Sequence, residues 1–264
     1  MATGIINEAY LNSGHAAKLN QLYINAKPCK YLVMENFFTE EIADDLFKNF
    51  PSIKDLNVKR KSEDYHFERW HPSFAKIREA VSSNQWYQQL EKITGIEGLH
   101  TTTDALGSGV HQGKNGSYVD IHIDVNMNPK LGLWRRINLL VYLNKNWKAE
   151  YGGDLELWNK EMTECMVKVP PTFNTAVIFY TDDNSPHGYR KINIPEDESR
   201  KSFYTYFYTK PEEGVSYRDS KFVSRPDDAT SKKLATGIKE TLKINGKKLL
   251  KFIGLKNLDF QDKN

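Results

Sequence analysis

The sequence predicts an α+β protein whose core is mainly β, arranged as a sandwich or jelly roll. From Thr101 onward, short apolar stretches alternate with Gly, Asn and Pro, which is typical of sheet proteins built from many short strands. Before Gly95, apolar residues recur at helical spacing. After Pro211 the chain becomes rich in Lys and returns to helical spacing. We therefore expect helices, then a sheet core, then a basic helical tail.

In the first part of the chain, residues 5–24 predict a helix interrupted near Ser13 and Gly14, and residues 31–34 predict a short strand. A second helix should begin after Thr39, because Thr is a favoured N-cap residue and acidic residues follow it. Residues 74–93 predict one amphipathic helix. The segment 54–72 has no clear period and is rich in charge and aromatics, so we interpret it either as a solvated surface loop or as a lid over a site.

The sheet core is predicted from seven strand patterns, at residues 101–110, 117–124, 135–143, 154–158, 165–169, 175–180 and 201–209. Residues 229–254 predict two helices separated at Asn245 and Gly246. We accordingly expect a single domain over residues 1–210, with a helical part at 1–95 and a jelly-roll core at 100–210. Residues 211–264 would form a basic helical C-terminal extension.

Composition limits the class of protein. A chain of 264 residues suits one sizeable domain, and its net charge of +3 is too small to indicate a nucleic-acid binder. The positive charge is concentrated in the Lys-rich tail, which we interpret as solvated helix surface. The two cysteines, Cys29 and Cys165, lack metal-ligand spacing and favour a reducing compartment. The sequence has no signal-peptide pattern and no apolar run of about 18–20 residues, so we expect a soluble, cytoplasmic protein without a membrane span.

The chemistry is suggested by His122-Ile123-Asp124. In a strand, residues i and i+2 project to the same face, so His122 and Asp124 can hold one metal ion from one side. Two His and one carboxylate on one face of an octahedron are the ligands of non-haem Fe(II) oxygenases. Further along, His187 follows an apolar strand pattern, and Arg200 enters the last strand with Ser202. A guanidinium fork suits a carboxylate in a water-poor pocket.

Taken in this order, these residues resemble the Fe(II)/2-oxoglutarate-dependent oxygenases, in particular their prolyl-hydroxylase-like branch. The resemblance extends over roughly residues 30–210 and includes two further features, the run Tyr142–Trp147 and the pair Gly152-Gly153. It implies a cupin-like double-stranded β-helix in which His122, Asp124 and His187 bind Fe(II) and are the catalytic centre. It also implies that Arg200 and Ser202 bind 2-oxoglutarate, that O2 is consumed, that succinate and CO2 are released, and that ascorbate is an expected further cofactor.

The resemblance also gives roles to residues around this centre. Related halogenating enzymes lack the carboxylate, so the presence of Asp124 favours hydroxylation. Tyr142 resembles the tyrosine that bonds the cosubstrate in prolyl hydroxylases, although a core tyrosine is an equal interpretation. Asn138 lies four residues earlier and on the same strand face, so it can line the pocket. Arg135 and Arg136 begin this strand; one of them should point inward and read an anionic or carbonyl-rich substrate.

Three alternatives differ in function. A nucleic-acid demethylase of the same superfamily would carry a second Arg six residues after Arg200, where this chain has Tyr206. A protein prolyl hydroxylase is the nearest alternative by motif, through Tyr142–Trp147. A non-catalytic β-barrel binding module would keep the fold and lose the iron, against which the intact His-Asp-His set argues. We expect the substrate to be a small polar metabolite or a peptide, and we do not expect a nucleic-acid partner.

Overall fold

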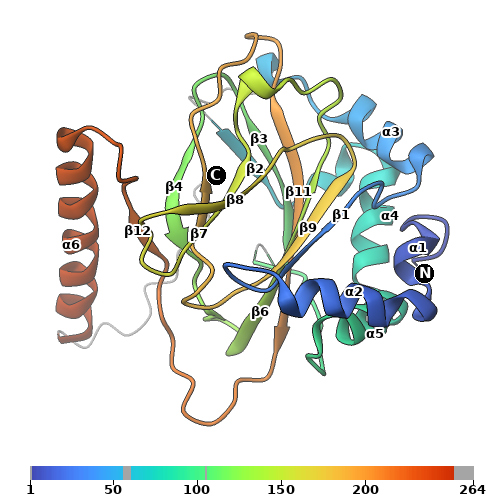
Figure 1. Ribbon diagram of the computed structural model, residues 1–264, viewed down its shortest axis with the longest axis horizontal. Coiled ribbons are helices and arrows are strands. Elements are labelled where there is room, and N and C mark those ends of the chain that lie inside the picture. The colour runs from blue at the N-terminus through green and yellow to red at the C-terminus, as the bar shows by residue number, and fades with distance from the viewer. Residues whose placement is uncertain (1, 56–60, 105, 253–264) are drawn as a thin grey trace.

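Two antiparallel sheets that face each other form the centre of the computed structural model, which describes residues 2–55, 61–104 and 106–252 (Figure 1). Helices α1–α5 cover the outer face of the larger sheet, and α6 stands beyond the edge of the smaller one. This arrangement confirms the predicted α+β class and the jelly roll. No helix among the described residues is long and apolar enough to cross a membrane.

The larger sheet has the strand order β1-β9-β6-β11-β3-β2, with β5 paired to β6. Its strands are β1 (Tyr31–Met34), β2 (Lys61–Asp64), β3 (Ser108–Gly113), β5 (Met127–Asn128), β6 (Leu133–Tyr142), β9 (Thr175–Tyr180) and β11 (Arg200–Thr209). The smaller sheet has the order β12-β4-β10-β7-β8. Its strands are β4 (Val119–Ile123), β7 (Leu155–Trp158), β8 (Cys165–Val169), β10 (His187–Tyr189) and β12 (Lys221–Val223).

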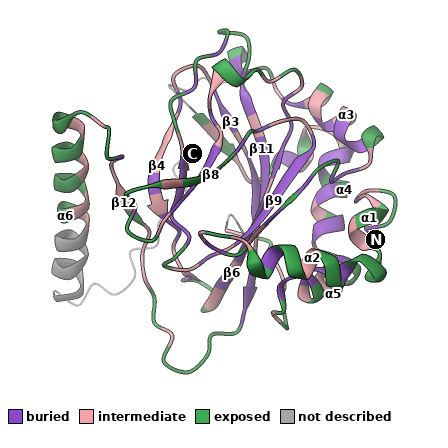
Figure 2. Cartoon of the chain, in the orientation of Figure 1, coloured by how far each residue is buried: buried purple, intermediate pink, exposed green. Residues whose placement is uncertain are grey.

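Alternation along β6 and β11 separates the core from the site. Leu139 and Val141 of β6 and Phe203 and Phe207 of β11 are fully buried against the helices. The residues between them face the smaller sheet, because successive side chains of a strand point to opposite faces. Most of these inward residues are buried as well, as the purple strands of Figure 2 show. The polar side chains on this inner face therefore lie between the two sheets.

The helical layer is built on aromatic packing. Trp86 is completely buried and meets the ring of Phe37 edge-on, with 5.3 Å between the ring centroids. The helices and helical turns before β3 are α1 (Glu8–Leu11), α2 (Ser13–Asn25), α3 (Glu40–Asn49), η1 (Ile53–Asp55), η2 (Phe67–Arg69), α4 (Pro72–Val81) and α5 (Asn84–Thr94); η3 (Ala149–Tyr151) precedes β7. The interruption of the first helix and the start of α3 after Thr39 agree with the sequence prediction.

The single helix predicted over residues 74–93 is wrong. The chain forms α4 and α5 with a break at Ser82 and Ser83. The Ser83 hydroxyl accepts a hydrogen bond from the backbone N–H of Trp86 at 3.2 Å and so caps α5. Ser competes well for this capping position and less well for a helix interior. Apolar residues keep the helical spacing across the break, so the sequence pattern does not reveal where one helix ends and the next begins.

The segment 54–72 is more regular than predicted. It contains the edge strand β2, which pairs with β3, and the turn η2. β3 itself begins at Ser108, seven residues later than expected. Residues 56–60 lie outside the described residues, so the lid interpretation of this segment stays a prediction.

The C-terminal part differs from the sequence prediction in two ways. β12 adds a strand to the smaller sheet beside β4, although only helix was expected after residue 210. α6 (Thr230–Phe252) is one helix, so the predicted break at Asn245 and Gly246 is wrong. Asn and Gly each disfavour a helix interior by only about 1 kcal/mol or less, which a long helix can absorb. The domain boundary at residue 210 stays a prediction.

Candidate metal centre

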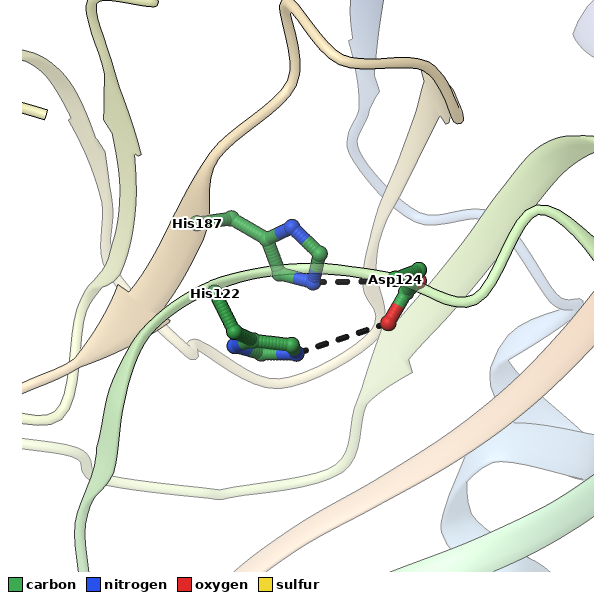
Figure 3. Close-up of side chains that lie close together, drawn as sticks. All are labelled: His122, Asp124 and His187. Atoms are coloured by element: carbon green, nitrogen blue, oxygen red, sulfur yellow. Dashed lines mark ion pairs between the residues drawn. The ribbon is translucent and has the colours of Figure 1, made fainter. Parts of the chain in front are cut away.

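Two neighbouring strands of the smaller sheet supply the centre (Figure 3). His122 of β4 lies directly opposite His187 of β10 in the antiparallel register. Opposed residues of an antiparallel pair share a face of the sheet. Asp124 follows the last residue of β4, and its carboxylate turns back toward both imidazoles (Figure 3).

The three side chains offer one ligand atom each within 4.8 Å of one another. His122 Nε2 lies 3.4 Å from Asp124 Oδ1, and His187 Nε2 lies 3.9 Å from Asp124 Oδ2. Among the residues described, this is the one cluster of at least three His, Cys, Asp or Glu side chains that could hold a metal ion. The His, carboxylate and His set matches the donors of non-haem Fe(II) oxygenases.

Hydrogen bonds on the far side of each imidazole fix its orientation. His122 Nδ1 lies 3.1 Å from the carbonyl oxygen of Asp120, and His187 Nδ1 lies 2.9 Å from that of Ser185. A carbonyl oxygen only accepts, so each Nδ1 must carry the proton and donate it. Each Nε2 then keeps its lone pair toward the centre, as a metal ligand requires.

The charges of the centre support the same protonation states. Burial and the neighbouring His122 lower the pKa of His187 to about 4, so its ring is neutral near pH 7. Burial raises the pKa of the Asp124 carboxyl, but His187, His122 and Arg135 outweigh that effect and hold it below its usual range. The centre therefore presents the neutral imidazole of His187 and the carboxylate of Asp124 beside the His122 ring, a donor set suited to a cation.

Two residues of β6 hold the Asp124 carboxylate. Asn138 donates from Nδ2 to Asp124 Oδ2 at 3.3 Å, and Arg135 Nη1 lies 3.8 Å from the same oxygen. Arg135 is 2% exposed; its guanidinium lies over the Tyr206 ring, with Cζ 3.6 Å from the centroid, and donates to the Tyr208 hydroxyl at 3.1 Å. Arg135 thus finds its partners within the chain.

A second polar pocket lies where Arg200 begins β11. Arg200 is buried and donates from Nε to the carbonyl oxygen of Gly153 at 2.8 Å. Its Cζ lies 4.9 Å from the ring centroid of Tyr142 and 4.1 Å from that of Tyr189. Burial raises the pKa of the Tyr142 hydroxyl, which keeps it protonated as a donor. That hydroxyl is buried without a hydrogen-bond partner among the described residues.

Gly153 has a specific role in this pocket. Its φ is +79°, in the region that favours glycine, and a Cβ there would lie 2.6 Å from Ile192 Cγ2 and 3.2 Å from Arg200 Cδ. A larger residue would displace the Arg200 side chain. The Gly152-Gly153 pair therefore does more than admit the next strand: it lets the backbone approach Arg200 closely.

Two further residues suggested by the sequence, Ser202 and Arg136, lie on opposite faces of the larger sheet. Ser202 is buried and opposes Tyr142 in the register of β11 and β6, so it lies on the site face. Arg136 points to the opposite face, where Nη1 donates to Thr209 at 3.2 Å and Nη2 donates to Tyr180 at 3.3 Å. The alternation expected for the two arginines is present, and Arg136 is remote from the centre.

Sequence reasoning missed Tyr189 and Phe222. Tyr189 lies two residues after His187 on the same strand, so the two-residue period could have found it. The Phe222 ring stacks on His122, with centroids 4.9 Å apart and planes 9° apart. It comes from β12, a strand of three residues that no periodic pattern could reveal. Its partner β4 lies about 100 residues earlier in the chain.

Residues 108–208 match the family model of the 2OG-Fe(II) oxygenase superfamily. This range begins at β3, ends within β11 and contains all three candidate ligands as well as Arg200. No curated protein matched the chain.

Several solved structures share the fold. An oxidoreductase of the 2OG-Fe(II) oxygenase family from Burkholderia pseudomallei aligns at a TM-score of 0.53 and 15% identity, over 76% of this chain and 92% of that chain. A Trichoplax adhaerens prolyl hydroxylase, in complex with a peptide fragment of the hypoxia inducible factor oxygen degradation domain, gives 0.51 and 19%, over 75% and 91%. HygX from Streptomyces hygroscopicus, with nickel, 2-oxoglutarate and hygromycin B bound, gives 0.51 and 13%, over 75% and 95%. At these identities the likeness shows a common fold.

Proposed function

Residues 108–208 match the 2OG-Fe(II) oxygenase superfamily, and from that premise we propose that the chain is an oxygenase that hydroxylates an unactivated C–H bond of a polar small molecule or a peptidyl substrate. The superfamily uses Fe(II), 2-oxoglutarate and O2. The observation that carries the proposal is the cluster of His122, Asp124 and His187, in which one ligand atom of each residue lies within 4.8 Å of the others and both Nδ1 atoms contact backbone carbonyls.

The donor set fits Fe(II) as the resident metal. Two imidazole nitrogens and one carboxylate oxygen fill three positions and leave the others for cosubstrate and O2. Asn138 and Arg135 fix the carboxylate, and the carbonyls of Asp120 and Ser185 fix the rings. Such outer contacts raise metal affinity because the ligands need no reorganisation on binding.

The Arg200 pocket fits the distal carboxylate of 2-oxoglutarate. A buried guanidinium favours a carboxylate partner with fork geometry. The unpartnered Tyr142 hydroxyl supplies a further donor, because a buried polar group without a partner is costly until a ligand satisfies it. Ser202 lies beside both in the register. We assign these three residues to the cosubstrate and Asn138 to positioning Asp124.

The chain contributes binding, orientation and exclusion of water. When bound, iron and O2 supply the oxidation of the C–H bond while 2-oxoglutarate is converted to succinate and CO2. The centre is enclosed between the two sheets, where Phe179 packs edge-on against His187 with centroids 4.7 Å apart. Exclusion of water from such a site strengthens each charge contact and protects reactive species from side reactions.

The substrate class is the open part of the proposal. A fold of this kind accommodates a peptide in the Trichoplax adhaerens prolyl hydroxylase and hygromycin B in HygX. Protein prolyl hydroxylation therefore remains the second candidate for this chain, supported by the Tyr142–Trp147 run. A binding module without catalysis is disfavoured by the complete set of two oriented imidazoles and one carboxylate in the centre.

The test is succinate formation by the full chain with Fe(II), 2-oxoglutarate and O2, screened over proline-containing peptides, other peptides, amino acids and amino sugars. The expected result is iron-dependent 2-oxoglutarate turnover that His187→Ala abolishes and that one substrate class stimulates. The matched control, His15→Ala, changes an exposed histidine far from the centre in the sequence and should retain wild-type turnover. Equal turnover in the wild type and His187→Ala would contradict the proposal. Stimulation only by proline-containing peptides with hydroxyproline formed would select prolyl hydroxylation.

A further inference from the structure

The outward side of α6 carries a stripe of exposed apolar side chains. Leu234, Ile238 and Leu242 are 66%, 52% and 66% exposed. They follow one another at intervals of four residues, and residues at this interval are neighbours on one face of a helix. Most of the described part of α6 is exposed, whereas the strands of the core are buried (Figure 2). Single exposed apolar residues are common, but apolar residues gathered in one row indicate an interaction surface.

The other side of α6 is polar and is attached to the rest of the protein. Lys232 Nζ lies 2.7 Å from Asp120 Oδ1, and Lys243 Nζ lies 3.3 Å from Asp219 Oδ2. Lys243 also donates to the carbonyl oxygen of Ser220 at 2.6 Å. The two lysines are separated by about three helical turns, so they project to the same side of the helix. The helix therefore turns its polar side to the protein and its apolar side outward, which reverses the usual arrangement of a surface helix.

Two further lysines flank the apolar stripe. At about 100° per residue, Lys233 lies on one side of Leu234 and Lys239 lies on the far side of Leu242. Both lysines are exposed. Among the residues that the structure describes, no carboxylate forms an ion pair with either of them. The stripe is thus apolar along its centre and positively charged along its borders.

This combination of apolar and positive groups selects among the possible occupants of the face. A second copy of α6 would bring lysines of the two helices toward one another, which is unfavourable for like charges. An anionic lipid surface is complementary to both parts of the face, because apolar side chains enter the boundary between headgroups and acyl chains while lysines stay beside the phosphates. α6 stands beyond the edge of the smaller sheet (Figure 1), so its outward side is open to a flat surface.

We propose that α6 is a peripheral membrane anchor that docks the protein on anionic lipid surfaces, with Leu234, Ile238 and Leu242 inserted among the headgroups. The helix would lie in the plane of such a surface rather than cross it. α6 packs against β12, and β12 pairs with β4, the strand that carries His122. Docking through α6 would therefore hold the metal centre near the lipid surface.

The test is co-sedimentation of the full chain with two kinds of vesicle, phosphatidylcholine alone and phosphatidylcholine with about 30% phosphatidylserine. The wild type should bind the anionic vesicles about 10-fold or more tightly than the neutral ones, and added salt should reduce this preference. The triple variant Leu234→Gln, Ile238→Gln and Leu242→Gln should lose about 10-fold or more in affinity for the anionic vesicles. Gln is a good helix former and the three positions are exposed, so thermal unfolding should match that of the wild type.

A single charge and two controls make the test more specific. Lys239→Gln should weaken binding to anionic vesicles about 5-fold, since one lysine near such a surface contributes about a fivefold factor. Leu131→Gln changes a leucine that is 55% exposed in the turn between β5 and β6, and Lys160→Gln changes an exposed lysine after β7. Both controls should bind as the wild type does.

Three outcomes would overturn the proposal. The first is no preference of the wild type for anionic vesicles, whether it binds both kinds or neither. The second is wild-type affinity in the triple variant. The third is dimer formation without lipid that the triple variant abolishes, measured by sedimentation velocity, because the face would then be covered by a second copy of the chain.

Discussion

At the scale of single residues, the Tyr142 hydroxyl is buried next to Arg200 without a partner of its own. Tyr142→Phe removes an unsatisfied polar group from the free protein and a hydrogen-bond donor from the cosubstrate complex. We expect the dissociation constant for 2-oxoglutarate to rise roughly 5- to 10-fold, since one hydrogen bond contributes about 1–1.5 kcal/mol. The melting temperature without ligand should stay the same or rise. Calorimetric titration and thermal unfolding measure the two quantities, and an unchanged dissociation constant would exclude Tyr142 from the cosubstrate pocket.

Glu63 also predicts a pH dependence of stability. Burial raises the pKa of its carboxyl, but hydrogen bonding to His111 and to Tyr204 outweighs that effect and lowers the pKa from 4.5 to about 2. Between these values the unfolded chain binds the proton more readily than the folded protein does, so stability falls as pH falls through this window. The stabilisation should be complete above about pH 4.5.

The measurement for Glu63 is the urea midpoint of the wild type and of Glu63→Gln at a series of pH values. The advantage of the wild type should be greatest near neutrality and shrink as pH falls from 4.5 toward 2. Glu161→Gln, which removes an exposed carboxylate, should follow the wild type throughout. An advantage that does not change with pH would show that Glu63 does not have the lowered pKa.

At the scale of elements, β12 connects the C-terminal part of the chain to the metal centre through Phe222. This ring stacks on His122, and Phe222 and His122 are directly opposed in the register. Phe222→Ala removes the support of that imidazole. We expect Fe(II) affinity to fall about 10-fold or more, the range typical of residues that hold a metal ligand in place.

Competition with a coloured chelator would measure Fe(II) affinity in Phe222→Ala. Val223→Ala is the matched control, because the next residue of the same strand points to the opposite face and packs against Ile121, Ile123 and Trp158. Val223→Ala should lose stability while it keeps most of its Fe(II) affinity. Equal losses of Fe(II) affinity in both variants would indicate that β12 stabilises the fold and has no specific effect on the metal centre.

The sequence predicted the elements with strong periodicity and failed where tertiary contacts decide. Strands β6, β9 and β11 were predicted to within about two residues. The three metal-ligand candidates, His122, Asp124 and His187, lie together in the structure. β2 was missed because an exposed edge strand needs no apolar alternation. The contact of Glu63 with His111 could not be predicted for the same reason, since it depends on the pairing of β2 with β3 rather than on any local pattern.

At the scale of the whole molecule, a buried ion pair fastens the C-terminal segment to the smaller sheet. Glu156 of β7 and Arg225 are 1% and 2% exposed, and Arg225 donates to Glu156 Oε2 from Nε at 3.0 Å and from Nη2 at 2.8 Å. Arg190 adds a third donor, to Glu156 Oε1 at 3.0 Å. Removal of Arg225 takes two donors from a buried carboxylate and leaves Arg190 as its remaining charged partner.

Arg225→Ala should therefore destabilise the protein by about 3 kcal/mol, the lower end of the range for a broken buried pair, because Arg190 still pairs with Glu156. The double variant Glu156→Ala with Arg225→Ala should lose less than the sum of the two single variants, because each single variant includes the cost of its stranded partner. Denaturant unfolding of the four proteins gives the coupling free energy. Strict additivity would indicate that the two side chains do not interact in solution.

We propose that His122, Asp124 and His187 hold the iron to which 2-oxoglutarate binds beside Arg200. The most direct measurement is an anaerobic calorimetric titration of Fe(II), followed by 2-oxoglutarate, into the wild type, His122→Ala and Arg200→Ala. The wild type should bind one Fe(II) per chain and then one 2-oxoglutarate, and His122→Ala should lose most of its iron binding. Arg200→Ala should keep its iron and lose roughly 10- to 150-fold in cosubstrate affinity, the equivalent of about 1.5–3 kcal/mol for a charge-assisted contact. Wild-type Fe(II) affinity in His122→Ala, or wild-type 2-oxoglutarate affinity in Arg200→Ala, would contradict the claim.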